Sequence, residues 1–484
     1  MPGLGDRIGA ALRLPARRGK RVAVVVTIVL LAVVAGVGVT VLGAAVLVNR
    51  VATVVPPPPP VVPRLALRPA GVEGPAPTRA GVSAVLDPLV AAGGLGTLSG
   101  QVLDPATGTV LWQRDPAAAL VPGSTAKLLT ASAALLALDH QEQLHTTVLA
   151  GAEPGTVVLV GGGDPTLAAA GPGTATGYPG AARLDDLVDQ VRAAAPGPVR
   201  RVLVDVSRYT GDALAPGWFP GDVAGGDIAP IEPVMLDGGR ADPAQEISPR
   251  AAKPASAAAE ELARRLGADP DTVSVGTAPP GAVVLGEVSS PPIQDLVATA
   301  LQRSDNVLAE ALAREVARAT GAPESFSGAS EAVLTVLRRH GFDVSGVTMV
   351  DGSGLSVDDA VPATLLTELL GAAATPDKAN ADKSSPDGAH QQRTAALRPL
   401  LVGLPVAGGS GTLADRYHGP TASGRGWVRA KTGTLTGVNS LAGTVLDTEG
   451  GVLVFALLSN GPSPMSARPR LDALAAGLRS CGCH

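Results

Sequence analysis

A serine and a lysine three residues apart are the first group in this sequence that could carry out chemistry. Ser124 and Lys127 follow a Pro-Gly pair and open an apolar run, residues 125–138, that predicts a helix. Residues at i and i+3 lie one turn apart on the same helix face. An alcohol needs an adjacent base to become a good nucleophile, and a neutral lysine can be that base when its pKa is lowered. Taken alone, a helix cap beside a surface lysine also explains the pair.

A second polar group interrupts two predicted helices. Ser304-Asp305-Asn306 lies between the apolar segments 293–301 and 307–320. A hydroxyl and an amide on such a turn could relay a proton and hold a substrate carbonyl. An ordinary N-cap of the following helix is the simpler explanation of this triplet by itself.

A third group lies in a segment with strand character, residues 427–435, ahead of two further predicted strands. Lys431-Thr432-Gly433-Thr434 offers a cation and hydroxyls that could receive a carboxylate at a strand edge. Gly433 would let another backbone approach closely. A solvated lysine in a strand-end turn would give the same pattern.

In this order, Ser-x-x-Lys, Ser-Asp-Asn and Lys-Thr-Gly resemble the motif set of the penicillin-recognising serine enzymes. Within that superfamily the chain most resembles the class C penicillin-binding proteins, the D-alanyl-D-alanine carboxypeptidase/endopeptidase family. The resemblance covers roughly residues 85–480. Its supporting segments are residues 161–167, 234–240, 351–356 and 411–413.

The resemblance implies an α+β fold in which a catalytic domain is split in sequence by a smaller inserted domain. The catalytic part would be a transpeptidase/β-lactamase-like domain, an antiparallel sheet with helices, formed by residues 81–148 and 290–480. Residues 149–289 would form the insertion. The small third domain of the longest family members is expected to be absent.

The resemblance also implies a role for each motif residue. Ser124 would attack the peptide bond between two D-alanines, and Lys127 would accept its proton. Lys431 would help to keep Lys127 neutral by placing a second cation nearby. Ser304 would pass the proton to the leaving amine, and Asn306 would orient the substrate amide.

Further residues are implied for substrate binding. Lys431, Thr432 and Thr434 would hold the terminal D-alanine carboxylate, and the backbone N–H groups of Ser124 and Thr434 would form an oxyanion hole. An acidic residue of the inserted domain would approach the active lysines, and Asp222 in the segment 216–222 is the candidate. The expected substrate-binding set is therefore Thr432, Gly433, Thr434 and Asp222.

The N-terminal segment predicts a membrane anchor. Residues 22–48 carry no charge, and as a helix they would extend about 40 Å, more than the roughly 30 Å of a bilayer core. Basic residues precede the segment, so residues 1–21 are expected in the cytoplasm. The Pro-rich residues 49–80 would be a stiff linker. We expect a single-pass protein of the plasma membrane with its catalytic part on the cell-wall side.

Composition limits the partners. A formal net charge of −5 and only three Trp, three Tyr and four Phe argue against nucleic-acid binding. The six histidines are scattered without a metal-binding pattern, and Cys481, Cys483 and His484 lie at the chain end, so neither a metal nor another cofactor is implied. The expected partners are peptidoglycan peptides ending in D-Ala-D-Ala, β-lactam antibiotics and the membrane.

Two alternatives share the three motifs. A class A-like β-lactamase would need a glutamate for deacylation, usually in a Glu-x-x-x-Asn segment between the second and third motifs. No glutamate in that interval of this sequence has Asn four residues later. A catalytically silent, membrane-tethered cell-wall binding module would keep the fold without the reaction, and intact Ser124 and Lys127 argue against it.

Overall fold

The computed structural model describes residues 77–376, 386–461 and 463–480. The predicted membrane anchor at residues 22–48, nearly all of the linker and the terminal Cys481, Cys483 and His484 lie outside these residues. Among the residues that are described, no helix is both long and apolar enough to cross a membrane.

An antiparallel sheet joins the two ends of the described chain. The two central strands are buried along nearly their whole length, and the one formed by residues 452–460 is accordingly an apolar run up to its last two residues. The first strand pairs with the last in sequence, with Gly100 opposite Leu457. The strand order is β10 (Val428–Leu435), β11 (Val438–Leu446), β12 (Val452–Asn460), β1 (Thr97–Asp104) and β2 (Thr109–Arg114).

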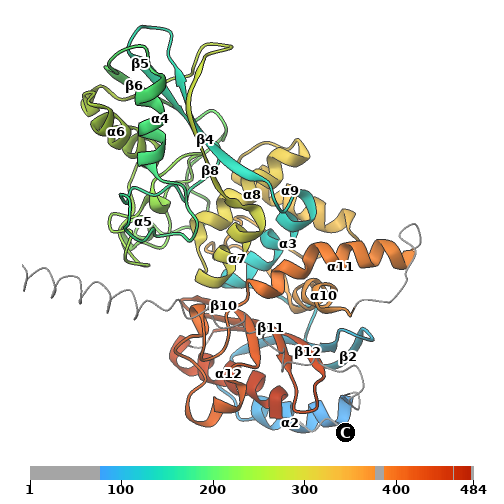
Figure 1. Cartoon of the computed structure of the whole chain (residues 1–484). Coiled ribbons are helices and arrows are strands. Elements are labelled where there is room, and N and C mark those ends of the chain that lie inside the picture. The colour runs from blue at the N-terminus through green and yellow to red at the C-terminus, as the bar shows by residue number, and fades with distance from the viewer. Residues whose placement is uncertain (1–76, 377–385, 462, 481–484) are drawn as a thin grey trace, which may run out of the picture. The chain divides into compact units, whose positions relative to one another are not determined.

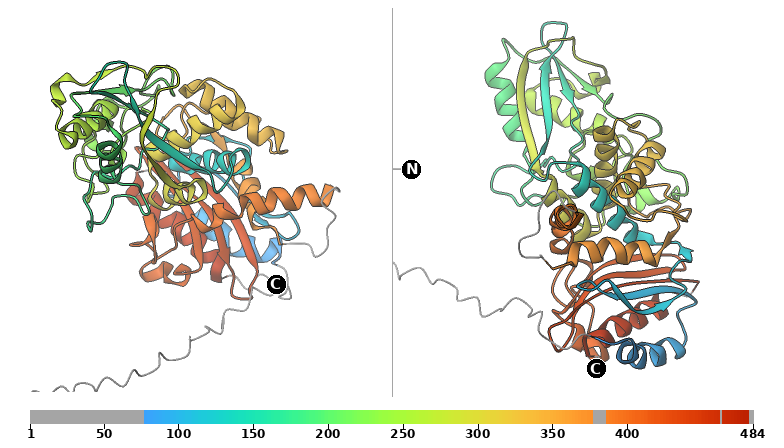
Figure 2. Two further views of the ribbon diagram at one scale, coloured as in Figure 1. Left: turned by 45° about the horizontal axis from the view of Figure 1, so that its top comes forward. Right: turned by 90° about the vertical axis from the view of Figure 1, so that its right-hand side faces the viewer.

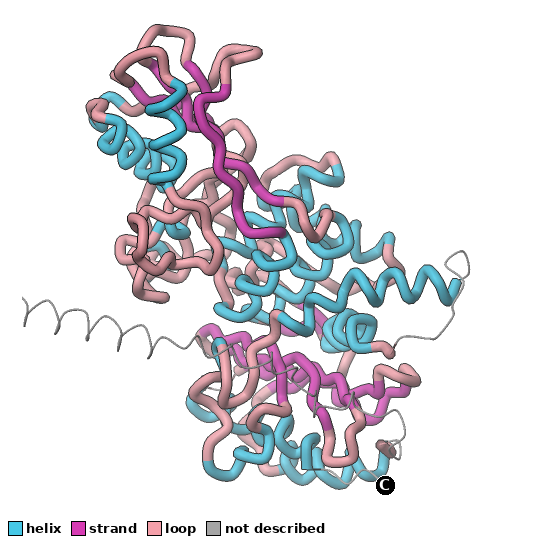
Figure 3. The backbone as a smooth tube through the Cα atoms, viewed as in Figure 1, coloured by secondary structure: helices cyan, strands magenta, loops and turns pink. Residues whose placement is uncertain are grey.

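Helices cover both faces of this sheet (Figure 1; Figure 3). On one face, α2 (Arg79–Ala91) and α12 (Pro464–Ser480) pack against each other and against the strands. On the other face, α10 (Ala363–Ala374) contacts β1, β11 and β12 and separates them from further helices. These helices are α3 (Lys127–Ala137), α7 (Ile293–Arg303), α8 (Asn306–Thr320), α9 (Phe326–Arg339) and α11 (Pro386–Val402).

A second sheet is formed by residues 143–292. Its two longest strands, β4 (Gln143–Ala150) and β8 (Val284–Pro292), run antiparallel side by side (Figure 2). They extend across the expected domain boundaries at 148/149 and 289/290. Helices α4 (Leu184–Ala194) and α6 (Pro254–Leu266) pack with it around a separate apolar core. The strand order is β7 (Ser274–Val275), β6 (Arg201–Asp205), β5 (Thr156–Val160), β4 (Gln143–Ala150) and β8 (Val284–Pro292).

The strand-like runs on either side of residues 104–108 also predict a hairpin. That hairpin, the predicted helices on either side of Ser304 and the three predicted C-terminal strands are confirmed. The polar, Pro-, Asp-, Lys- and Ser-rich composition of residues 371–392 predicts a surface loop, and this prediction is in part wrong. Helix α10 continues to Ala374, because Gly371 packs against Leu103 of the sheet, and α11 already begins at Pro386. The polar composition of this stretch concealed both helix ends.

Candidate active site

The first motif lies on a tight turn that leads into a buried helix. Ser124 is part of the 3-10 turn η1 (Gly123–Ala126), and Lys127 is the first residue of α3. Gly123 has φ +53°, and a Cβ there would lie 3.2 Å from the backbone nitrogen of Thr434, so glycine suits this position on both counts. The Lys127 side chain is 1% exposed, and its Nζ lies 3.0 Å from Ser124 Oγ. The predicted pairing of these two side chains is present.

The other contacts of the Lys127 amine define its chemistry. Nζ donates to Asn306 Oδ1 at 2.5 Å and to the backbone oxygen of Ser353 at 2.7 Å. Both carbonyl oxygens can only accept hydrogen bonds. A neutral amine has two N–H groups and one lone pair, so the two N–H groups satisfy these acceptors. The lone pair is then left for the hydroxyl proton of Ser124, as a general base requires.

Burial and the neighbouring charges have opposite effects on the pKa of Lys127. Burial lowers the pKa of Lys127 to about 8, while the nearby carboxyls of Asp351, Glu310 and Asp305 act in the opposite direction. The main cause is therefore desolvation and not the charge of Lys431, which is a correction to the expected cause.

The carboxyls beside Lys127 are themselves perturbed. Burial and the neighbouring Asp351 raise the pKa of Glu310 to about 8 and that of Asp359 to about 9. Both groups therefore hold protons at neutral pH, which limits the negative charge around the lysine.

The second motif occupies a sharp break between α7 and α8. Ser304 ends α7 in the left-handed region, at φ 56° and ψ 35°, which is rare for a residue other than glycine. Asp305 caps α8 by accepting a hydrogen bond from the backbone nitrogen of Leu308 at 2.9 Å. The triplet therefore combines two roles. Asp305 caps the helix, and Ser304 and Asn306 remain available for the expected catalytic roles.

A buried ion pair fixes this break. Asp305 Oδ2 accepts hydrogen bonds from Tyr178 Oη at 2.7 Å and from Arg240 Nη2 at 2.9 Å. Burial would raise the pKa of Asp305, but Arg240 and Arg250 outweigh it and lower the pKa to about 2. The strained turn is therefore held by charge-assisted hydrogen bonds from Tyr178 and Arg240, which lie far from it in sequence.

The lysine of the third motif contacts the serine of the second motif. Lys431 on β10 is fully buried, and its Nζ donates to Ser304 Oγ at 2.8 Å and to the backbone oxygen of Thr432 at 2.7 Å. Burial, with the positive charges of Lys127 and Arg416, lowers the pKa of Lys431 well below its usual range. A bound carboxylate would supply the counter-charge that this ammonium lacks.

The backbone of β10 packs directly on the nucleophile turn. A Cβ on Gly433 would lie 2.5 Å from the Pro122 carbonyl oxygen and 3.0 Å from the Ser124 nitrogen, so a side chain cannot fit there. The close approach brings the backbone nitrogens of Ser124 and Thr434 together, as an oxyanion hole requires. The Thr432 hydroxyl lies 2.8 Å from the Thr412 hydroxyl, whereas Thr434 is exposed.

Asp222 is not brought to the lysines. It opens the short helix α5 (Asp222–Gly225), where its carboxylate accepts a hydrogen bond from the backbone nitrogen of Phe219. None of its described interactions involves Lys127 or Lys431. The carboxyls that act on Lys127 are those of Asp305, Glu310, Asp351 and Asp359, so the sequence-based assignment of Asp222 is corrected.

Several residues that shape the site had no assigned role in the sequence. The Asp351 carboxylate, which accepts from Trp218 Nε1 at 2.7 Å, also accepts from the backbone nitrogens of Ser353, Gly354 and Ser356. It thereby folds the loop that presents the Ser353 carbonyl oxygen to Lys127. The signal was present, since segments 351–356 and 234–240 supported the family resemblance, but their spacing says nothing about contacts.

No group of three or more His, Cys, Asp or Glu side chains among the described residues is arranged to hold a metal ion.

Solved structures share the fold. Penicillin binding protein 4 from Haemophilus influenzae matches with a TM-score of 0.66 and 20% identity, covering 82% of this chain and 98% of that one. The same protein complexed with a β-lactam matches with a TM-score of 0.59 and 22% identity, covering 81% of this chain and 98% of that one. These likenesses show that the chain has the α+β fold of that protein.

Sequence comparison identifies the family. The sequence model of the D-Ala-D-Ala carboxypeptidase 3 (S13) family matches residues 82–247 and 241–480. Carboxypeptidase DacB of Mycolicibacterium smegmatis is 49% identical over 420 residues, covering 86% of this chain and 87% of that protein. The chain belongs to the D-Ala-D-Ala carboxypeptidase 3 (S13) family, a family of serine-type D-Ala-D-Ala carboxypeptidases, and the family predicted from its motifs is confirmed.

Proposed function

We propose that the chain hydrolyses peptidoglycan peptides ending in D-Ala-D-Ala through an acyl-enzyme on Ser124. The observation that carries this proposal is the position of Lys127 Nζ between Ser124 Oγ and two carbonyl acceptors, Asn306 Oδ1 and Ser353 O. Lys127 accepts the hydroxyl proton as Ser124 Oγ bonds to the penultimate D-alanine carbonyl. The backbone nitrogens of Ser124 and Thr434 stabilise the resulting oxyanion.

The leaving half of the substrate meets the second lysine. Lys431, with the hydroxyls of Thr432 and Thr434, binds the terminal carboxylate, and Ser304 passes a proton to the leaving amine. The 2.8 Å contact between Lys431 Nζ and Ser304 Oγ supports both roles, because it links the carboxylate anchor to the proton donor. Water then hydrolyses the ester and regenerates Ser124.

A β-lactam would acylate the same serine, and labelling with a fluorescent penicillin tests the proposal. Wild-type protein should be labelled, and the Ser124→Ala variant, shown to be folded by circular dichroism, should not. A long-lived adduct supports a carboxypeptidase over the β-lactamase alternative. Folded wild-type protein that takes no label would favour a silent binding module and contradict the proposal.

We propose in addition that residues 22–48 anchor the enzyme in the plasma membrane, with the catalytic part on the cell-wall side. The support is the uncharged apolar length of this segment and the basic residues before it. Cell fractionation tests this: full-length protein should sediment with membranes, and a variant lacking residues 1–48 should not. Full-length protein in the soluble fraction would contradict the anchor.

A further inference from the structure

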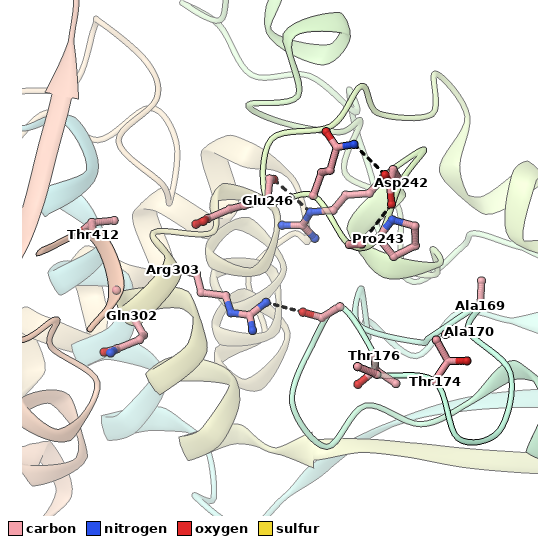
Figure 4. Close-up of a pocket in the computed structure, with 16 residues that line it drawn as sticks. Ala169, Ala170, Thr174, Thr176, Asp242, Pro243, Glu246, Gln302, Arg303 and Thr412 are labelled. Carbon is pink, nitrogen blue, oxygen red and sulfur yellow. Dashed lines mark hydrogen bonds between the residues drawn. The ribbon is translucent and has the colours of Figure 1, made fainter. Parts of the chain in front are cut away.

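A short turn between the second and third motifs has no role in the steps proposed so far. Its sequence, Gly-Thr-Leu at residues 411–413, supported the family resemblance, and it forms the 3-10 turn η4 (Gly411–Leu413). Leu413 is fully buried in the apolar cluster that also contains side chains of α2 and α12. Thr412 is half-buried and lies at one wall of a cavity of about 1000 Å³ (Figure 4). The turn is thus held by its leucine and presents its threonine to open space.

The turn is tied to the helix that leads into the second motif. Gln302, two residues before Ser304, donates through Nε2 to Ser410 Oγ at 2.5 Å. Gly411 has φ +56°, and a Cβ at this position would clash with the backbone oxygen of Gln302, so only glycine fits. The turn therefore lies directly against the end of α7.

The same turn contacts the strand that carries the third motif. Thr412 Oγ1 lies 2.8 Å from Thr432 Oγ1, and either hydroxyl can be the donor. The Thr412 side chain makes no other described hydrogen bond. The turn therefore connects the end of α7, which leads to Ser304, with the residue that directly follows Lys431.

A bound carboxylate would decide which of the two hydroxyls donates. A carboxylate can only accept hydrogen bonds, so Thr432 has to direct its single proton to the substrate and can then only accept from Thr412. Hydrogen bonds that point the same way along a chain polarise and strengthen one another. A neutral ester accepts weaker hydrogen bonds than a carboxylate does, so it gains less from the same chain.

The other hydroxyl of the third motif has a comparable neighbour. Nη2 of Arg468, on α12, lies 3.4 Å from Thr434 Oγ1. A guanidinium can only donate, so Thr434 accepts here and keeps its own proton for a ligand. Both hydroxyls proposed to hold the carboxylate are therefore next to a group outside the motif that can donate to them.

We propose that Thr412 is a positioning residue, which donates to Thr432 Oγ1 so that the Thr432 hydroxyl is directed at the terminal carboxylate of the substrate. Thr412 thereby favours peptides with a free terminal carboxylate over neutral ones. It acts through Thr432 and does not bind the carboxylate itself. The inference rests on the proposed function, because it requires the carboxylate to be bound at Thr432.

Two substitutions at Thr412 and one control test the inference. Thr412→Val removes the hydroxyl and keeps the branched shape, and Thr412→Ser keeps the hydroxyl. Thr174→Val is the matched control, because Thr174 lines the opposite wall of the same cavity (Figure 4) and none of the described hydrogen bonds involves its hydroxyl. Full-length proteins in detergent are assayed on a peptide ending in D-Ala-D-Ala and on the methyl ester of that peptide.

Thr412→Val should lower kcat/KM for the acid by about five- to tenfold, which corresponds to the loss of one hydrogen bond, and for the ester by less than about twofold. Thr412→Ser and Thr174→Val should stay within about twofold of wild type on both peptides. In a Thr432→Val background there is no hydroxyl left to direct. There Thr412→Val should change kcat/KM for the acid by less than about twofold.

Equal losses on acid and ester, no loss on the acid, or no rescue by serine would overturn the inference alone. So would an undiminished loss in the Thr432→Val background, because Thr412 would then act independently of Thr432. That comparison needs only the acid, so it tests the inference without any activity on the ester. A wild-type protein that neither hydrolyses the acid nor takes a fluorescent penicillin label would instead overturn the proposed function.

Discussion

Lys127 and Lys431 are both buried, yet their surroundings suit them to opposite tasks. Lys127 Nζ meets two carbonyl acceptors and the nucleophile, and the charges that act on it are carboxyls. Lys431 Nζ meets a hydroxyl and one carbonyl, and the charges that act on it, those of Lys127 and Arg416, are positive. Burial lowers the pKa of both, so burial alone does not assign their roles.

The hydrogen-bond partners make the difference. The acceptors around Lys127 use both N–H groups of a neutral amine and leave its lone pair for the Ser124 hydroxyl. Lys431 has no carboxylate partner among the described residues, so a substrate carboxylate completes its environment. One lysine is arranged to take a proton, and the other is arranged to hold an anion.

Removal of the base should have the largest effect. Lys127→Ala should slow acylation by a fluorescent penicillin by about 10⁴-fold, the upper end for general-base catalysis, because the same amine also holds Asn306. Stopped-flow or timed gel labelling measures the rate, and circular dichroism checks the fold. A loss below about tenfold would show that Lys127 is not the base.

Loss of the ion pair between Arg240 and Asp305 tests whether this pair holds the turn that presents Ser304 to Lys431. Arg240→Met removes the guanidinium that pairs directly with the buried Asp305 carboxylate, so that only the charge of Arg250 still compensates it, and should lower the free energy of unfolding by about 3–5 kcal/mol. The pKa of Asp305 is depressed in the fold, so its contribution to stability is present above its unfolded pKa of about 3.9. That contribution is lost as pH falls through about 2.

Urea unfolding at pH 7 measures the change. Arg264→Met is the control, because Arg264 is half-exposed and pairs with Glu261 on the surface, where about 1 kcal/mol or less is expected. Equal losses in the two variants would show that the Asp305 cluster does not hold the turn.

Removal of the Lys431 charge should separate carboxylate binding, proposed for Lys431, from proton transfer, proposed for Lys127. Lys431→Gln should lower kcat/KM for a peptide with a free terminal carboxylate by about 10²- to 10³-fold. The carboxylate loses its charged partner, whereas the methyl ester of the same peptide never had one. Kinetics on both peptides measure this, and the ester should change by less than about tenfold. Equal losses on acid and ester would contradict an anion-binding role.

The smallest expected effect is a shift in the pH dependence of acylation when one of the carboxyls near Lys127 is removed. Glu310→Gln keeps an acceptor for the Gly352 nitrogen but removes a carboxyl group that becomes charged as pH rises through about 8 and then raises the pKa of Lys127. The pKa of Lys127 should fall further, so the acylation rate should rise with pH at a lower pH than in wild type. A pH profile of acylation measures the shift. A shift to higher pH would contradict the electrostatic account.

The order of the motifs predicted the family, and local patterns predicted the elements that carry them. The hydrophobic run after Lys127, the polar break at residues 304–306 and the strand at residues 428–435 are each visible within a short window. The pairing of β1 with β12 joins the two ends of the described chain and has no local signal of its own. In the sequence, only the family resemblance, which implied an antiparallel sheet, pointed toward a pairing of this kind.

The partners of the site residues could not be predicted in the same way. Tyr178, Arg240 and Asp351 act through contacts between segments distant in sequence, and no spacing rule reveals such contacts. Asp222 shows the opposite error. The sequence placed an acidic residue in a suitable segment, but it could not predict the direction of the side chain. Its carboxylate is used by the turn in which it lies.

The pKa of Lys127 tests the central claim most directly. The sequence holds only six lysines, so ¹³C-labelled lysine gives a spectrum that Lys127→Arg and Lys431→Arg can assign. The Lys127 resonance should titrate near pH 8, and its neutral fraction should rise as pH increases through that value. The Lys431 resonance should titrate well below its usual range in the free enzyme and move upward when a carboxylate ligand binds. A Lys127 resonance that titrates near 10.5, the value of an unperturbed lysine, would contradict the assignment of this residue as the base.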